Sequence, residues 1–271
     1  MPAGSIMGAD ARGEEDVAEL LLVVIGFVGA FASGLLGIGG GVILVPMALY
    51  LPPLLGLPSY TMAEVVGMSM VQVLAASVLG LRSHALRGSV PQKLAVPLGA
   101  AVGIGAIAGG LLSAVVSEAA LRIVFAGLAI IASGLMLAPA KGSGEGTDVP
   151  ADFRLTLAAF LSLGVGLLSG LVGIGGGVLM IPMLTTLFGL PLRLVIGTSI
   201  AVVFVAGLMG TLGKAMTHQI PWAASIFLVF GALAGAPLGA RVSHRLPVGV
   251  LRKLLAATIG VTAIKMVFEL F

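Results

Sequence analysis

The sequence has no cysteine, few charged side chains and few aromatic ones. The lack of cysteine excludes disulfides, thiol catalysis and iron–sulfur clusters, but it leaves the cellular compartment undetermined. Charged residues make up 9% of the 271 positions, against about 25% in a typical soluble domain. The chain therefore cannot build an ordinary water-facing surface. An aromatic content of 5% also argues against a barrel girdled by aromatic side chains.

Apolar and small residues take the place of the missing charges. The chain is 59% hydrophobic and contains 41 glycines, and small residues let membrane helices approach one another closely. We therefore predict an all-α polytopic membrane protein in a lipid bilayer. The net charge of +3 could suggest a nucleic-acid partner. We expect none, because the basic residues fall mainly in short loops between apolar stretches, as the positive-inside rule requires.

The N-terminal segment resembles a cleavable signal only at first sight. Its apolar run ends in Ala30-Phe31-Ala32, which is similar to a signal-peptidase site. A signal peptide needs a positive region before the apolar run. Here that region is acidic, with Asp10, Glu14, Glu15, Asp16 and Glu19 opposed only by Arg12. We therefore predict that residues 1–16 form a retained acidic tail before the first membrane helix.

The chain contains two copies of one unit. The segment SGLLGIGGGVILVPM at 33–47 and the segment SGLVGIGGGVLMIPM at 169–183 are identical at 11 of 15 positions. Further along, VVGMSM at 65–70 corresponds to VIGTSI at 195–200, and the two copies align from there without gaps through Gly109 and Gly239.

The duplication divides the chain into two membrane repeats. We predict the first repeat at 17–140 and the second at 154–271. A polar linker at 141–153 joins them, and its composition is that of a flexible segment.

Each repeat divides into about five apolar segments. They lie at roughly 17–36, 42–56, 62–81, 91–113 and 119–138, and then at roughly 154–172, 178–190, 194–213, 221–241 and 248–270. A helix needs about 20 residues to span a bilayer. The second segment of each repeat is short and contains proline, so whether it spans or re-enters stays open.

Loop charges indicate the orientation of the repeats. Basic residues gather in the loops at 82–93 and 241–253, and both loops should therefore be cytoplasmic. Both loops lie on the same side if the first two segments of a repeat make two crossings, or none as a re-entrant hairpin. The charges therefore favour an odd number of crossings per repeat and an inverted duplication. Inverted repeats are a recurring transporter architecture, with the binding site near the midplane at the repeat interface.

The duplicated glycine strings predict the site. Non-helical backbone at membrane depth is tolerated only where it is buried in protein or lines a watery cavity. Breaks at Gly37–Gly41 and Gly173–Gly177 would start new helices near Val42 and Val178. The first N–H groups of a helix lack partners within it and carry its positive dipole end. Two such N-termini would make an anion site without a buried cation.

Thirteen residues are candidates for binding the substrate. They are Ser33, Gly39, Gly40, Gly41, Ser69, Gln72, Ser169, Gly175, Gly176, Gly177, Arg193, Thr198 and Ser199. The alternative is that glycines only permit close helix packing, which is what we expect at the spaced glycines of the fourth segments. Serine and threonine in membrane helices often bond only to their own helix backbone.

Other polar residues have simpler interpretations. We expect Glu64 to cap a helix or to reach the interface, and His84, Arg193 and Lys214 to anchor helices at the interface. Arg193 is also close enough to the predicted site to attract an anion. The sequence shows no metal-ligand cluster, no serine–histidine–acid spacing and no phosphate-binding P-loop. We therefore expect no metal, no cofactor and no enzymatic activity.

The duplicated motif SGLxGIGGGxxxxPM, the VVGMSM and VIGTSI elements and the two-copy layout resemble the sulfite exporter TauE/SafE family. The resemblance covers nearly the whole chain from about residue 17. It implies a multi-pass secondary transporter of the inner membrane that exports small sulfur-containing anions such as sulfite, sulfoacetate or other organosulfonates. We expect alternating access as its mechanism. A channel for a small neutral or other anionic solute and a non-transporting scaffold remain alternatives. Transport direction, coupling ion and oligomeric state, a homodimer included, stay open.

Overall fold

The computed structural model describes residues 4–36, 39–85, 91–137 and 153–243, and every regular element in these ranges is a helix. The first repeat contributes α1 (Gly4–Leu36), α2 (Gly41–Leu54), α3 (Met62–Ala85), α4 (Gln92–Leu112) and α5 (Glu118–Leu137). The second contributes α6 (Leu155–Val172), α7 (Gly177–Pro182), the π-helix η1 (Met183–Leu187), α8 (Leu192–Met216) and α9 (Trp222–Ser243). Six of these helices are long and apolar enough to cross a membrane. The prediction of an all-α, multi-pass membrane protein is confirmed.

The helix breaks lie at the two glycine strings, as predicted. Gly40 and Gly176 are the N-caps of α2 and α7, with φ angles of 62° and 75°, a region that glycine enters without steric cost. The two short segments then differ. Helix α2 continues for 14 residues, whereas α7 ends after 6 residues and widens into η1. The predicted last segment and almost all of the predicted linker lie outside the described residues.

Helices from different repeats pack in pairs. Helix α1 lies along α9, α4 lies along α6, and α3 crosses α8. A Cβ added at Gly34 would overlap the carbonyl of Ala236, and one at Gly170 would overlap that of Ala106. These two contacts are equivalent, because Gly34 and Gly170 hold the same place in the duplicated strings and Ala106 aligns with Ala236 further along. The same close approach occurs at five of the spaced glycines of the fourth segments and confirms their packing role, whereas Gly99 and Gly103 face only side chains of α8. The five with carbonyls in the way are Gly105, Gly109, Gly231, Gly235 and Gly239.

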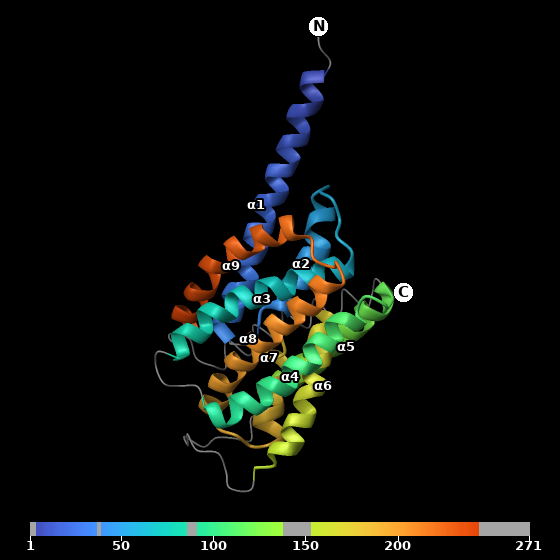
Figure 1. Ribbon diagram of the computed structural model, residues 1–271. Helices are drawn as coiled ribbons and strands as arrows, with labels where there is room; N and C mark the ends of the chain where they lie inside the picture. The colour runs from blue at the N-terminus through green and yellow to red at the C-terminus, as the bar shows by residue number, and fades with distance from the viewer. Residues whose placement is uncertain (1–3, 37–38, 86–90, 138–152, 244–271) are drawn as a thin grey trace.

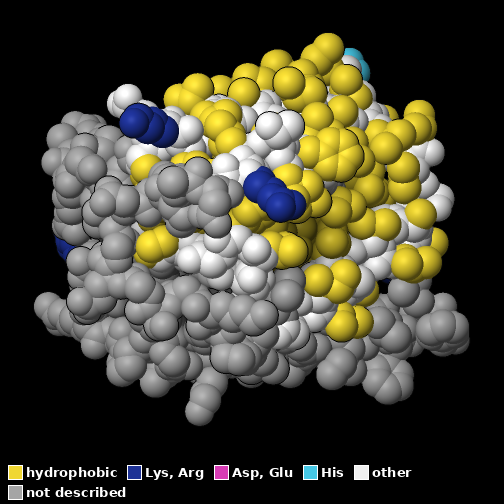
Figure 2. All heavy atoms as spheres, turned by 90° about the horizontal axis from the view of Figure 1, so that it is seen from below, with side chains coloured by type: hydrophobic (Ala, Val, Ile, Leu, Met, Phe, Trp, Pro, Cys, Tyr) yellow, Lys and Arg dark blue, Asp and Glu magenta, His cyan; other side chains and the backbone are white. Residues whose placement is uncertain are grey.

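The bundle has one basic end and one acidic end. At the basic end lie Lys93 and Arg154, where α4 and α6 begin, and Arg241, where α9 ends. Figure 2 views this end from below and shows Lys and Arg side chains without a described acidic one. Glu64 and Glu118 lie at the opposite, acidic end, where α3 and α5 begin. In Figure 1, α1 descends from the N-terminus at the top while α6 ascends from the bottom.

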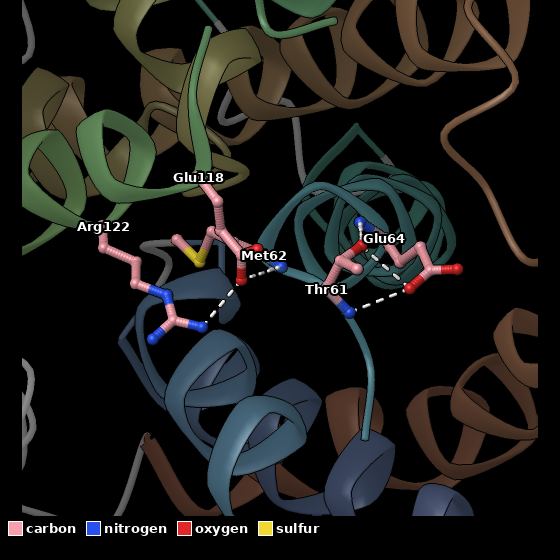
Figure 3. A network of polar contacts seen from close by, with 5 residues as sticks. All are labelled: Thr61, Met62, Glu64, Glu118 and Arg122. Carbon is pink, nitrogen blue, oxygen red and sulfur yellow. Dashed lines mark hydrogen bonds and ion pairs between the residues drawn. The ribbon is translucent and has the colours of Figure 1, made fainter. Parts of the chain in front are cut away.

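Helices α3 and α5 are joined at the acidic end (Figure 3). The backbone N–H of Met62 donates to Glu118 Oε1 over 3.2 Å, and Arg122 donates to the same oxygen over 2.7 Å. Next to them, Thr61 and Glu64 form a capping box: the Thr61 N–H donates to the Glu64 carboxylate, and the Glu64 N–H donates to Thr61 Oγ1. Glu64 is therefore a helix cap, one of the two roles predicted for it.

Replacing Glu118 by glutamine should weaken this junction slightly, and mainly above acidic pH. The hydrogen bond from Arg122 lowers the pKa of Glu118 below its usual 4.5, and partial desolvation acts in the opposite direction. A carboxyl group whose pKa is lower in the folded state than in the unfolded state stabilises the fold at pH values above its unfolded-state pKa. This contribution is lost as the pH falls through the folded-state pKa. Because the pair is exposed, we expect a loss of about 0.5 kcal/mol.

Thermal unfolding in detergent at pH 7 and pH 4 would measure this effect. The difference between Glu118→Gln and the parent protein should be smaller at the lower pH, where the Glu118 carboxylate is partly protonated. Glu15→Gln is a matched control, because Glu15 is exposed on α1. An equal loss at both pH values would show that charge is not what matters at Glu118.

Candidate functional site

The two glycine turns meet inside the bundle. A Cβ added at Gly39 would lie 3.4 Å from the Cα of Gly175, and one added at Gly175 would lie 3.4 Å from the oxygen of Gly39. Both residues have positive φ angles, 95° and 79°, and both are buried. Corresponding segments of the two repeats, far apart in the sequence, therefore share one place in the core.

Ser69 joins the two turns. Its hydroxyl donates to the carbonyl oxygen of Gly173 over 2.7 Å, and the Ser69 side chain is fully buried. The same carbonyl lies against Gly41, where an added Cβ would overlap it and would lie 2.8 Å from Ser69 Oγ. A helix leaves its last carbonyls without partners inside the helix, and Ser69 satisfies one of them where α6 ends. Ser69 thus holds the crossing of the two strings together.

One backbone N–H of each turn is already satisfied. The Gly41 N–H donates to the oxygen of Gly39 over 2.7 Å, and the Gly177 N–H donates to that of Gly175 over 3.0 Å. An anion would therefore compete with internal hydrogen bonds at these two positions. The earlier glycines of each string are the better candidates for backbone donors.

Three of the predicted side chains are buried and lack hydrogen-bond partners. Neither amide atom of Gln72, nor Oγ of Ser169, nor Oγ of Ser199 has a hydrogen bond in the described part of the chain. Each of these side chains is at most 1% exposed. An unsatisfied buried polar group costs about 1–3 kcal/mol, and native proteins contain few of them. Such a group is a mark of a ligand or of an ordered water.

Two of these side chains lie directly beside the turns. A Cβ added at Gly29 would lie 3.6 Å from Gln72 Nε2 and 3.6 Å from the oxygen of Gly40. This places the Gln72 amide at the first turn. A Cβ added at Gly176 would lie 3.6 Å from Ser169 Oγ, which places that hydroxyl at the second turn. The unpaired donors and the glycine turns therefore occupy the same region.

The remaining candidates behave differently. Thr198 is fully buried, but its hydroxyl donates to the Leu194 carbonyl of its own helix over 2.8 Å. This is the alternative to substrate binding that we expected for some serines and threonines. Arg193 lies in the first turn of α8, and its side chain lies outside the described part of the structure. Ser199, one residue beyond Thr198, has no partner for its hydroxyl among the described residues.

A cavity of about 70 Å³ leads toward the first turn. It is bounded by α1, α3, α8 and α9 and lies toward the basic end, where Gly80 and Ala240 line it. Ser33 and Gly39 also line the cavity, and Ser33 lies next to Gly40. Two residues that the sequence predicted therefore border this cavity. Neither Gly29 nor the cavity-lining Ser77 was predicted, because neither belongs to the duplicated strings.

Lys214 corrects one sequence interpretation. We expected it to anchor α8 at the membrane interface, but it is fully buried. Its ammonium donates to Ser113 Oγ over 2.5 Å and to Gln219 Oε1 over 2.9 Å. The chain reverses direction after α8 at His218, where φ is 55°, and this turn brings Gln219 back over the lysine. Sequence reasoning missed Ser113 and Gln219, since single polar residues at helix ends give no motif.

Comparison with known proteins identifies the family. The model of the family "Sulfite exporter TauE/SafE" matches residues 22–266. "Probable membrane transporter protein YunE" of Bacillus subtilis is 22% identical over 266 residues, covering 92% of this chain and 97% of the relative. A "Probable membrane transporter protein" of Xylella fastidiosa strain Temecula1 is 30% identical over 234 residues, covering 83% and 86%. No solved structure matches the chain. The chain therefore belongs to the sulfite exporter TauE/SafE family, a family of membrane transporters and not of enzymes.

Proposed function

We propose that the protein is a secondary transporter that exports small sulfur-containing anions, such as sulfite, sulfoacetate or other organosulfonates, across the inner membrane. The observation that carries this proposal is the group of unpaired buried polar side chains beside the paired glycine turns. These side chains are Gln72 and Ser169. The description of the family supports sulfur-containing anions as the cargo.

The site suits an anion with several acceptor oxygens. Helix α2 begins at Gly41 and runs for 14 residues, so its positive dipole end points toward the turns. Backbone N–H groups at a helix start bind anions, and we assign this role to Gly39 and Gly40. The Gln72 amide and the Ser169 hydroxyl are further neutral donors that become satisfied when a sulfite or sulfonate oxygen arrives. The anion is then held without a paired cation.

The packing supports alternating access by inverted repeats. Helix pairs formed across the repeats, α1 with α9 and α6 with α4, make two equivalent lobes around the turns. Rocking of such lobes about a central site is the usual transporter mechanism. The basic end is the cytoplasmic side by the positive-inside rule. The cavity lies toward that side, which is the side from which an exporter takes its cargo.

Binding and flux measurements with a panel of anions test the proposal. The panel contains sulfite, sulfoacetate, taurine, sulfate and a carboxylate, with binding measured by calorimetry and flux in proteoliposomes. We expect saturable binding and flux for at least one sulfur-containing anion. Flux that does not saturate would indicate a channel instead. Absence of both binding and flux would leave only the scaffold alternative.

A variant pair locates the site within the same assay. Ser169→Ala removes an unpaired hydroxyl beside Gly176 and should weaken binding about tenfold, as expected for loss of one hydrogen bond to a charged group. Thr198→Ala is the matched control, because the Thr198 hydroxyl is already occupied by Leu194, and binding should be unchanged. Equal effects of the two substitutions would exclude Ser169 from the site.

A further inference from the structure

Positions around the cavity at the basic end are packed more loosely than the equivalent positions at the acidic end. Helices α3 and α8 align without gaps through VVGMSM and VIGTSI, so that Gly80 and Ile200 correspond to Gly210 and Met70. At the basic end, a Cβ added at Gly80 would lie 3.8 Å from Ile200. At the acidic end, a Cβ added at Gly210 would lie only 2.8 Å from the sulfur of Met70. The same pair is loosely packed at one end and closed at the other.

Neighbouring positions show the same asymmetry. Ala240 of α9 lines the cavity, whereas its equivalent Gly110 of α4 packs against the backbone of α8. An added Cβ there would lie 3.1 Å from the oxygen of Gly210 and 3.2 Å from the Cα of Gly213. Ser77 of α3 also lines the cavity. Its equivalent, Gly207 of α8, packs on α3 instead, with 3.0 Å between an added Cβ and the nitrogen of Leu74.

The Lys214 cluster lies at this closed end. Ser113, just beyond the end of α4, and Gln219, beyond the end of α8, accept hydrogen bonds from the Lys214 ammonium. Gln219 Nε2 donates in turn to the oxygen of Gly110 over 3.3 Å. The cluster therefore joins α4 to α8 at the glycine contact that closes the acidic end.

The partners of Lys214 are unusual for a buried cation. Among the described residues its hydrogen-bond acceptors are a hydroxyl and an amide oxygen, and no carboxylate contacts it. A buried charge without a counter-charge is costly. Here two neutral acceptors offset that cost while the end is closed, and water would replace them once α4 and α8 separate.

We propose that Lys214, Ser113 and Gln219 form a latch that holds the acidic end closed while the cavity is open at the basic end. The buried charge makes the latch releasable, because the ammonium gains hydration when the acidic end opens. This inference rests on the proposed alternating access. It assigns the described conformation to the state that faces the basic end.

The latch predicts opposite effects for two kinds of substitution. Gln219→Leu removes an acceptor and leaves the ammonium buried with one partner fewer, which should favour opening of the acidic end. Adding Lys214→Met to that variant removes the charge itself, and an apolar replacement of a buried charged cluster is often tolerated or stabilising. In the double variant the acidic end should therefore be closed again.

Thiol labelling of the full-length protein in proteoliposomes tests this expectation. The natural chain has no cysteine, so each introduced thiol is unique. Ala76 is 5% exposed and lines the cavity, its equivalent Ala206 is 0% exposed, and the two form a matched pair of positions. With a small water-soluble methanethiosulfonate, Ala76→Cys should react readily and Ala206→Cys slowly. Gln219→Leu should speed labelling of Ala206→Cys about tenfold, the effect of about one lost hydrogen bond to a charge, and Lys214→Met should reverse this.

If Gln219→Leu leaves the labelling rate of Ala206→Cys unchanged, the latch is overturned. The same holds if adding Lys214→Met to Gln219→Leu does not slow the labelling again. Ser113→Ala removes the other acceptor and repeats the test if Gln219→Leu does not fold. The readout needs no substrate. Saturable anion flux together with unchanged labelling would contradict the latch alone, whereas the expected labelling without any flux would contradict the proposed function alone.

Discussion

Replacing Gln72 by leucine should raise the stability of the protein and abolish anion binding. The Gln72 amide is fully buried, and neither of its polar atoms has a hydrogen bond in the described part of the chain. An unsatisfied buried polar group costs about 1–3 kcal/mol, and leucine of similar size removes that cost. We expect unfolding in detergent to shift upward by several degrees, at about 2–4 °C for each kcal/mol.

The same substitution removes a donor from the first glycine turn. If the amide is kept unpaired in order to bind cargo, then stability and binding should change in opposite directions. Gln92→Leu is the matched control, since Gln92 is exposed at the start of α4 and should leave both properties nearly unchanged. A stabilised Gln72→Leu that binds the same anion with the same affinity would remove Gln72 from the site.

Gly41→Ala should prevent folding. Its methyl group would overlap the carbonyl of Gly173 and would lie 2.8 Å from Ser69 Oγ. Overpacking a core typically costs about 1–3 kcal/mol, and the cost should be larger here because the obstacle is backbone at the crossing of the two turns. Loss of monodisperse protein on size-exclusion chromatography is the expected result.

Gly176→Ala is the informative counterpart within the same motif. The nearest atom to its new methyl group would be Ser169 Oγ at 3.6 Å, so only the positive φ of 75° opposes the change, at a cost of about 1–2 kcal/mol. Gly56→Ala controls for that strain, because Gly56 has the same φ and nothing within 4 Å. Both variants should fold, and only Gly176→Ala should bind anions more weakly. A well-folded Gly41→Ala would show that the turns tolerate separation.

Much of the architecture could be predicted from the pattern of residues. The apolar segments, the breaks at GIGGG and the packing role of Gly105 and Gly109 follow from composition and spacing, which local physics controls directly. The meeting of Gly39 with Gly175 was a consequence expected of a duplicated unit with a central site. These features depend on what both repeats share.

Features that differ between the repeats could not be predicted. Ser69 and Ser199 occupy equivalent positions in the sequence, yet Ser69 bonds to Gly173 while the Ser199 hydroxyl has no partner among the described residues. Equivalent positions at the two ends are packed differently, and a sequence records no single conformation. Lys214 was misjudged for a related reason. A lysine near a helix end usually reaches the interface, and its burial depends on a turn at His218 that no local pattern announces.

Because helices of one repeat pack on helices of the other, we expect the two repeats to fold as one cooperative unit. The backbone surface that Gly34 offers is complementary to α9, and that of Gly170 to α4, so each half of the chain carries the packing surface that the other half lacks. Neither half can bury its glycine faces alone. The duplicated segments are therefore units of sequence but not of stability, and we expect a substitution in one repeat at such a contact to destabilise the other repeat as well.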